Sequence, residues 1–90
     1  MKETKIRKIK ELHMDTYMNE PYTLLSRVID ENVSHYFKDN RVILRDKDDA
    51  VLANIPLDEV KECCVKKFAS SHYQILFNLR DVQYKVLAVM

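Results

Sequence analysis

The spacing of apolar residues changes near residue 41 of this chain. Before that position, apolar side chains recur mainly at intervals of three and four residues, which is the spacing of one helix face. After it, apolar and polar residues often alternate, which is typical of strands with one buried face. The pattern therefore predicts helices first and then mostly sheet.

The first half is predicted to hold two helices. Residues 3–17 combine good helix formers with apolar residues three apart, although this spacing also allows an extended segment. Residues 21–37 begin at Pro21 and give the better helical pattern. Their apolar positions are Leu25, Val28, Ile29, Val33, Tyr36 and Phe37. We expect Asn40 to follow the helix end in the left-handed conformation that glycine usually supplies.

The middle of the chain is predicted to form a hairpin and a third helix. Residues 41–45 and 50–55 are rich in β-branched side chains and are joined by the loop Asp46–Asp49. Pro56 suits the first turn of a helix that would end near Ser70. The apolar face of this helix would carry Leu57, Val60, Cys64 and Phe68.

The last part of the chain alternates most plainly. Residues 73–79 and 82–88 predict two antiparallel strands joined at Arg80-Asp81. The second of them is apolar on both faces near its end, so we expect it to be central, covered, or paired with another copy.

The expected fold class is α+β, with the element order α-α-β-β-α-β-β in one domain spanning residues 1–90. A mostly antiparallel sheet of about four strands would be covered by two to three helices. Residues 1–20 would form a basic amphipathic N-terminal segment, most simply a helix.

The 90 residues include no glycine, and this absence narrows the candidate functions. Phosphate-binding loops, nucleophile elbows and dinucleotide-binding turns all require glycine where the backbone turns or approaches a ligand closely. Turns must then use other residues, so we expect positive φ angles at Asn40, in the loop Asp46–Asp49 and around Arg80-Asp81.

No residue cluster in the sequence predicts catalysis, a metal or a cofactor. His13, His35 and His72 lack the spacing of metal ligands. Asp46, Asp48 and Asp49 resemble the start of a calcium loop that lacks its glycine and its final glutamate. Ser70, Ser71 and His72 are consecutive, so they cannot present a nucleophile, a base and an orienting group in working geometry. We therefore expect a protein that is not an enzyme.

Cysteine use and hydropathy predict a cytoplasmic protein. Adjacent Cys63 and Cys64 are poorly placed to bond to each other, and Cys64 would pack inward as a reduced thiol. The apolar runs are too short for a membrane span or a signal peptide.

Charge is distributed in blocks, which suggests two classes of partner. Residues 1–10 hold five basic residues and one acid, whereas residues 11–65 hold twelve acids and six basic residues. Nucleic-acid binding is the alternative function, with phosphate contacts from Lys5, Arg7, Lys8 and Lys10. Its stacking surfaces would be Tyr73, Phe77 and Tyr84.

Protein binding is the leading hypothesis. The acidic middle would offer a partner surface formed by Asp46, Asp48, Asp49, Asp58, Glu59 and Glu62. Such a domain would act as an inhibitor or adaptor by occupying a partner's surface, with a homo-oligomer as a further option. In its length and lack of a site motif, the chain is similar to many phage or mobile-element proteins that act by occupying a host protein.

Overall fold

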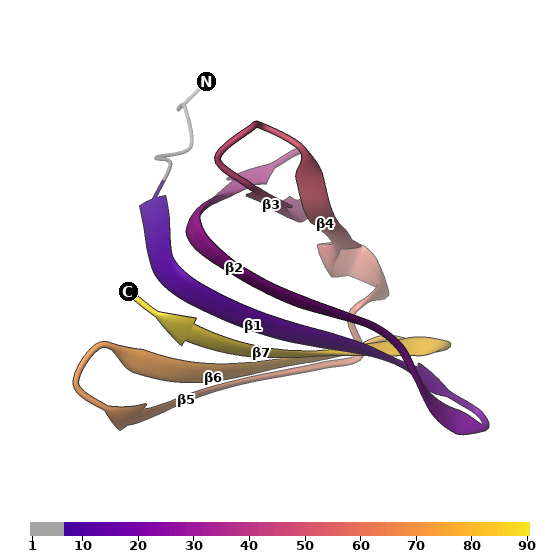
Figure 1. The fold of residues 1–90 in the computed structure, drawn as a ribbon. Helices are drawn as coiled ribbons and strands as arrows, with labels where there is room; N and C mark the ends of the chain where they lie inside the picture. The colour runs from indigo at the N-terminus through magenta and orange to yellow at the C-terminus, as the bar shows by residue number, and fades with distance from the viewer. Residues whose placement is uncertain (1–6) are drawn as a thin grey trace.

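A computed structural model describes residues 7–90, which form a single seven-stranded antiparallel sheet (Figure 1). The strands are β1 (Arg7–Asn19), β2 (Tyr22–Lys38), β3 (Arg41–Arg45), β4 (Val51–Pro56), β5 (Glu62–Ala69), β6 (His72–Asn78) and β7 (Val82–Val89). The single helical turn among these residues is the 3₁₀ turn η1 (Leu57–Glu59). None of the described residues form a helix long and apolar enough to cross a membrane.

The strand order is β4-β3-β2-β1-β7-β6-β5, so every strand pairs with its neighbours in sequence except at one place. The first strand also pairs with the last, with Leu12 opposite Ala88 and Met14 opposite Val86. A ring of seven strands would be complete if β4 paired with β5, but these two strands are the edges of the sheet. The ring is therefore open between β4 and β5.

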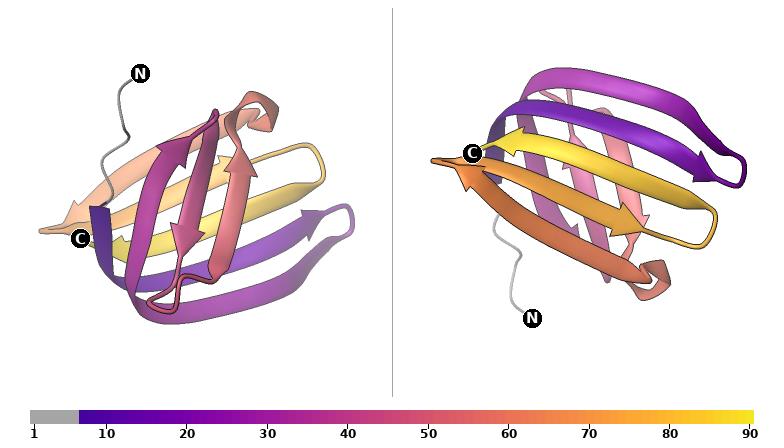
Figure 2. Two further views of the ribbon diagram at one scale, coloured as in Figure 1. Left: turned by 90° about the horizontal axis from the view of Figure 1, so that it is seen from above. Right: turned by 90° about the horizontal axis from the view of Figure 1, so that it is seen from below.

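The sheet folds over on itself because its two longest strands bend. Along β1 and β2 the pairing passes from Ile9–Val33 to Glu11–Glu31, and Asn32 lies between them with a φ of 55°. Beyond this bend, the end of β2 crosses with β3 and β4 over the layer of β1, β7, β6 and β5 (Figure 2). One sheet thus supplies both layers of the fold.

The hydrophobic core lies between the two layers. Leu12 and Met14 of β1 face it from one side, and Val33 and Ile55 face it from the other. All four are among the largest fully buried side chains. The remaining buried members of the core are Ile9, Val42, Leu44, Ala53, Leu79, Val86 and Ala88.

The expected α+β class with its covering helices is wrong, and the first two predicted helices are the strands β1 and β2. The bend brings Ile9 and Leu12, three residues apart, to the same inner face. In β2 the buried Val33 is accompanied by Leu25 and Ile29, which are exposed. Apolar residues on both faces of a bent strand therefore imitated the three- and four-residue spacing of a helix.

The third predicted helix, from Pro56 to Ser70, is also wrong. Its start is η1, and the rest is the strand β5, which pairs with β6. Cysteine, valine and phenylalanine have modest helix propensity and fit a pleated surface well. Cys64 and Phe68 lie on the exposed outer side of this strand, so the inward packing expected for Cys64 is wrong as well.

Both predicted hairpins are confirmed. Residues 41–45 and 51–56 pair as β3 and β4, and the C-terminal hairpin forms β6 and β7. The final strand is interior to the sheet, between β1 and β6, which is one of the three placements that its two apolar faces predicted. The pattern was reliable where partners are adjacent in sequence and joined by a short turn.

Asparagine and aspartate supply most of the left-handed backbone that glycine would otherwise provide. Positive φ angles occur at Asn32, Asp39, Asn40, Asp49 and Ser71. The expectation is confirmed at Asn40 and in the loop Asp46–Asp49, whereas the turn at Arg80-Asp81 uses no positive φ. Short polar side chains tolerate this conformation because they can form local hydrogen bonds.

Substitution of one isoleucine on each face tests the position of the core. Ile55 is 0% exposed and Ile29 is 72% exposed. We expect Ile55→Ala to lower the free energy of unfolding by about 2–5 kcal/mol, since it removes packed methylene groups and leaves a cavity. Ile29→Ala is the matched control, with an expected loss below about 1 kcal/mol. Equal losses in urea unfolding would contradict this placement of the core.

Candidate functional site

An apolar cavity of about 490 Å³ lies between the two layers of the folded sheet. Its lining includes residues from all seven strands. The deepest part, which we call the cavity floor, consists of the buried residues Ile9, Val42, Leu44, Ile55, Val86 and Ala88. The volume falls in the range of about 300–1,000 Å³ that is typical of small-molecule sites.

The mouth of the cavity is formed by exposed residues from β1, β2 and β5. Phe37 is 52% exposed and Val65 is 64% exposed, although both line the cavity. Arg7 and Cys63 are exposed lining residues as well. The cavity therefore opens beside β5, the strand that has no neighbour on its other side.

Two side chains with polar groups meet at the β1–β2 side of the cavity. Arg7 and His35 are directly opposite each other in the β1–β2 pairing, and both line the cavity. The Nε2 atom of His35 is buried and has no hydrogen-bond partner among residues 7–90. Burial lowers the pKa of His35, and the positive charge of Arg7 lowers it further. The neutral form of the imidazole is therefore favoured, and Arg7 carries the positive charge of the pair.

The free edge of β5 is the second feature that can bind. All eight residues of this strand are exposed, and it pairs only with β6. Its inner row, on the cavity side, is Cys63, Val65 and Lys67, because they pair with Phe77, Ile75 and Tyr73 of the cavity wall. Its outer row is Glu62, Cys64 and Lys66. An unpaired strand edge offers backbone donors and acceptors to a further strand.

The two cysteines lie on opposite faces of β5, and both thiols are free. Cys63 lines the cavity, whereas the Sγ atom of Cys64 lies 3.6 Å from Oε1 of Glu62. Desolvation raises the pKa of Cys64, and the neighbouring Glu62 carboxylate raises it further. Strand alternation thus gives these adjacent thiols different surroundings.

The six predicted acidic residues do not form a single surface. Asp46, Asp48 and Asp49 lie in the β3–β4 loop, whereas Asp58, Glu59 and Glu62 lie in η1 and at the start of β5. The six residues of β4 separate the two groups, which corresponds to about 20 Å of extended chain. We call the second group the β5 acidic cluster, because it lies at the beginning of the free edge.

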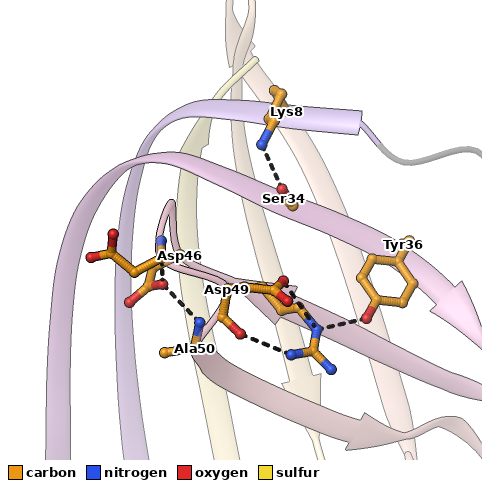
Figure 3. A network of polar contacts seen from close by, with 8 residues as sticks. Lys8, Ser34, Tyr36, Asp46, Asp49 and Ala50 are labelled. Atoms are coloured by element: carbon orange, nitrogen blue, oxygen red, sulfur yellow. Dashed lines mark hydrogen bonds and ion pairs between the residues drawn. The ribbon is translucent and has the colours of Figure 1, made fainter.

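The acidic loop is held by its own hydrogen bonds (Figure 3). Oδ1 of Asp46 accepts hydrogen bonds of 2.9 Å from the backbone N–H groups of Asp48 and Ala50. The Arg45 guanidinium donates to the backbone oxygen of Asp49 and to the Tyr36 hydroxyl. Asp46 therefore shapes the turn, which gives it a local structural role.

The predicted basic residues of β1 do not share one surface, because alternation along the strand places Arg7 and Lys8 on opposite faces. Lys5 lies outside the described residues. Arg7 faces the cavity, whereas Lys8 is on the opposite face and donates a 2.6 Å hydrogen bond to Oγ of Ser34. Lys10 is exposed at the bend. The predicted stacking residues Tyr73, Phe77 and Tyr84 are partly buried on inner rows of the sheet.

The outer face of β1 and β2 carries a polar network. Asp15 accepts hydrogen bonds from Arg27, at 2.8 and 3.3 Å, and lies 3.1 Å from Nε2 of His13. Nearby, the Tyr17 and Tyr22 rings stack with centroids 4.7 Å apart, and Nζ of Lys85 lies 5.1 Å from the centroid of Tyr17. Within residues 7–90, no three His, Cys, Asp or Glu side chains are arranged to hold a metal ion.

The cavity and the free edge were both missed in the sequence, because residues 57–70 were interpreted as a helix. One local signal favoured a strand here, because cysteine and valine disfavour a helix. The signal was weak, because the alternation of apolar and polar residues around Cys63 and Val65 is less regular than in the other strands. The pairing of β1 with β7 had no local signal.

Comparison of the chain with protein-family models, with curated proteins and with solved structures gives no match.

The Asp15–Arg27 pair predicts a specific loss of stability in acid. The hydrogen bond from Arg27 is the main cause that holds the pKa of Asp15 below its ordinary value of 3.8, although the carboxylate is only 15% exposed. The stabilisation is therefore present above about pH 5 and is lost as pH falls below the ordinary pKa. Asp15→Asn should lower the melting temperature at neutral pH and flatten its decline in acid.

Asp48→Asn is the control for this pH experiment, because the Asp48 side chain is exposed in the loop. It should leave the acid dependence of the melting temperature as in the unmodified chain. A steep acid decline that persists in Asp15→Asn would contradict the role of this carboxylate.

Proposed function

We propose that this chain is a non-enzymatic protein-binding domain that acts as an inhibitor or adaptor, and that an extended segment of its partner adds to the free edge of β5. The observation that carries the proposal is the open ring, which leaves eight exposed residues of β5 beside the mouth of an apolar cavity. Addition of a strand to such an edge provides backbone hydrogen bonds, and adjacent pockets for alternate side chains provide specificity.

The side chains of β5 define the segment that would fit. Partner residues opposite Cys63 and Val65 would point toward the cavity mouth and should be apolar. The strand begins at Glu62 of the β5 acidic cluster and carries Lys66 and Lys67 in its second half. The favoured segment therefore has alternating apolar residues, a basic residue near the start of β5 and an acidic residue near its end.

A second copy of the chain is the competing occupant of this edge. In an antiparallel pairing of two β5 strands, Glu62 of each copy can lie opposite Lys66 of the other, whereas the inner row contains Lys67 but no acidic residue, so Lys67 would have no opposite charge. A different protein can supply that carboxylate. Dimerisation is therefore the competing outcome, and it is tested directly below.

Only three of the six acidic residues predicted from the sequence have a role in the proposed binding. Asp58, Glu59 and Glu62 flank the edge, whereas the loop acids lie at the far end of β4. We further propose a cytoplasmic location, because two exposed adjacent thiols suit a reducing compartment. The phage or mobile-element analogy remains a hypothesis about origin.

Selection of linear peptides from a random display library tests the proposal with a defined probe. Enriched peptides should alternate apolar residues and carry opposite charges near their two ends. Val65→Lys should weaken their binding at least about tenfold, because it places a charge at the cavity mouth and beside Lys66 and Lys67. Val51→Lys is the matched control, since Val51 lies on the other edge strand and is 51% exposed.

Three results would contradict the proposal. The first is enrichment of peptides that bind Val65→Lys and Val51→Lys equally. The second is a dimer by light scattering that Val65→Lys dissociates, which would assign the edge to a second copy. The third is salt-sensitive oligonucleotide binding that is lost when Lys5, Arg7, Lys8 and Lys10 become alanine, which would favour the nucleic-acid alternative.

A further inference from the structure

The inner cavity has a chemistry that the β5 edge does not require. Its floor is apolar and buried, while Arg7 and His35 place a cation and an imidazole together at the β1–β2 side. We propose that this cavity binds a small amphipathic anion, with a linear or branched hydrocarbon tail on the floor and a carboxylate between Arg7 and His35. The proposal does not depend on a partner at β5.

The size and lining of the cavity support the apolar part of this ligand. The cavity of about 490 Å³ reaches the buried side chains of Leu44, Ile55 and Val86. Its volume is typical of sites that bind small molecules. A hydrocarbon tail is the matching occupant, because burial of apolar surface is favourable and requires no hydrogen bonds.

The arrangement of Arg7 and His35 supports the anionic part. Within residues 7–90, Arg7 forms no ion pair, and Nε2 of His35 is buried without a hydrogen-bond partner. A buried polar atom of this kind calls for an explanation, and a ligand oxygen that accepts its hydrogen provides one. The guanidinium matches a carboxylate through paired N–H donors.

The charge of the pair also restricts the ligand. Burial and the charge of Arg7 lower the pKa of His35 in the free protein, so the neutral imidazole is favoured before a ligand binds and Arg7 supplies the positive charge. A monoanion balances that charge, whereas a phosphate ester with nearly two charges would leave an excess negative charge against an apolar wall. A fatty carboxylate therefore fits better than a phosphorylated lipid or metabolite.

Calorimetric titration with decanoate and with decanol tests the carboxylate site. The unmodified chain should bind decanoate in a saturable manner and more tightly than decanol. Arg7→Gln should weaken decanoate binding roughly tenfold, as expected for a lost hydrogen bond to a charged group, and should leave decanol binding unchanged. Arg41→Gln is the matched control, because Arg41 is exposed and hydrogen-bonded to Asn54 away from the cavity lining.

Three results of this titration would overturn the proposal. The first is the absence of saturable decanoate binding by the unmodified chain. The second is equal weakening by Arg7→Gln and Arg41→Gln, which would indicate general attraction to positive charge. The third is loss of decanol binding in Arg7→Gln, which would show that Arg7 does not act through the carboxylate.

The adjacent cysteines offer an internal control for the location of the ligand. In Cys64→Ser, a bulky maleimide attached to Cys63 should block decanoate, because Cys63 is at the cavity mouth. In Cys63→Ser, the same group on Cys64 projects from the opposite face and should leave binding intact. Mass spectrometry should confirm complete labelling, since the raised pKa of Cys64 slows its reaction. Equal effects of the two labels would overturn the cavity as the binding site.

These outcomes are separable from those of the peptide experiment. Peptide recognition at the β5 edge is measured with Val65→Lys and Val51→Lys, whereas carboxylate recognition is measured with Arg7→Gln. Failure of decanoate to bind leaves the edge proposal standing. Failure of peptide selection likewise leaves the cavity assignment standing.

Discussion

The rest of this structure depends on one constraint, which is that a single sheet must bury one of its own faces. Residues 7–90 contain no α-helix that could cover this face. The sheet meets this constraint by bending β1 and β2 near Ile9 and Asn32, so that the apolar rows of β3 and β4 pack on those of β1 and β7. The pairing of β1 with β7 places the first and last strands side by side in the interior of the sheet. Every later feature follows from this self-covering arrangement.

The same arrangement accounts for both candidate binding features. Strands β3 and β4 lie over the layer that contains β1 and β7, and the cavity lies between these strands and extends to β5. Leu12, Met14 and Val33 are buried in the core outside the cavity lining, whereas Leu44 and Ile55 belong to both the core and the cavity floor. The open edge and the cavity mouth are two consequences of the missing pairing between β4 and β5.

Sequence-based prediction was accurate for strands whose pairing partners are close in sequence and inaccurate for strands whose partners are distant. Strands β3–β4 and β6–β7 pair across short turns, so alternation and turn residues were sufficient to identify them. Residues 3–17 and 21–37 were predicted as helices because the bend and the apolar residues on both faces of β1 and β2 disturb the period of two. Of the candidate residues, Glu62 lies on the free edge, and Arg7, Tyr73 and Phe77 line the cavity, but none was predicted in that setting.

The sequence alone determined the two hairpins, the use of Asn40 and of the loop Asp46–Asp49 for left-handed turns, and the absence of glycine-dependent motifs from these 90 residues. These depend on local backbone preference and side-chain alternation, which neighbouring residues specify. Only the tertiary structure decided the pairing of β1 with β7, the fold of the sheet onto itself and the juxtaposition of Arg7 with His35 beside an apolar cavity. These depend on contacts between distant segments, because burial of a shared apolar face can override local propensity.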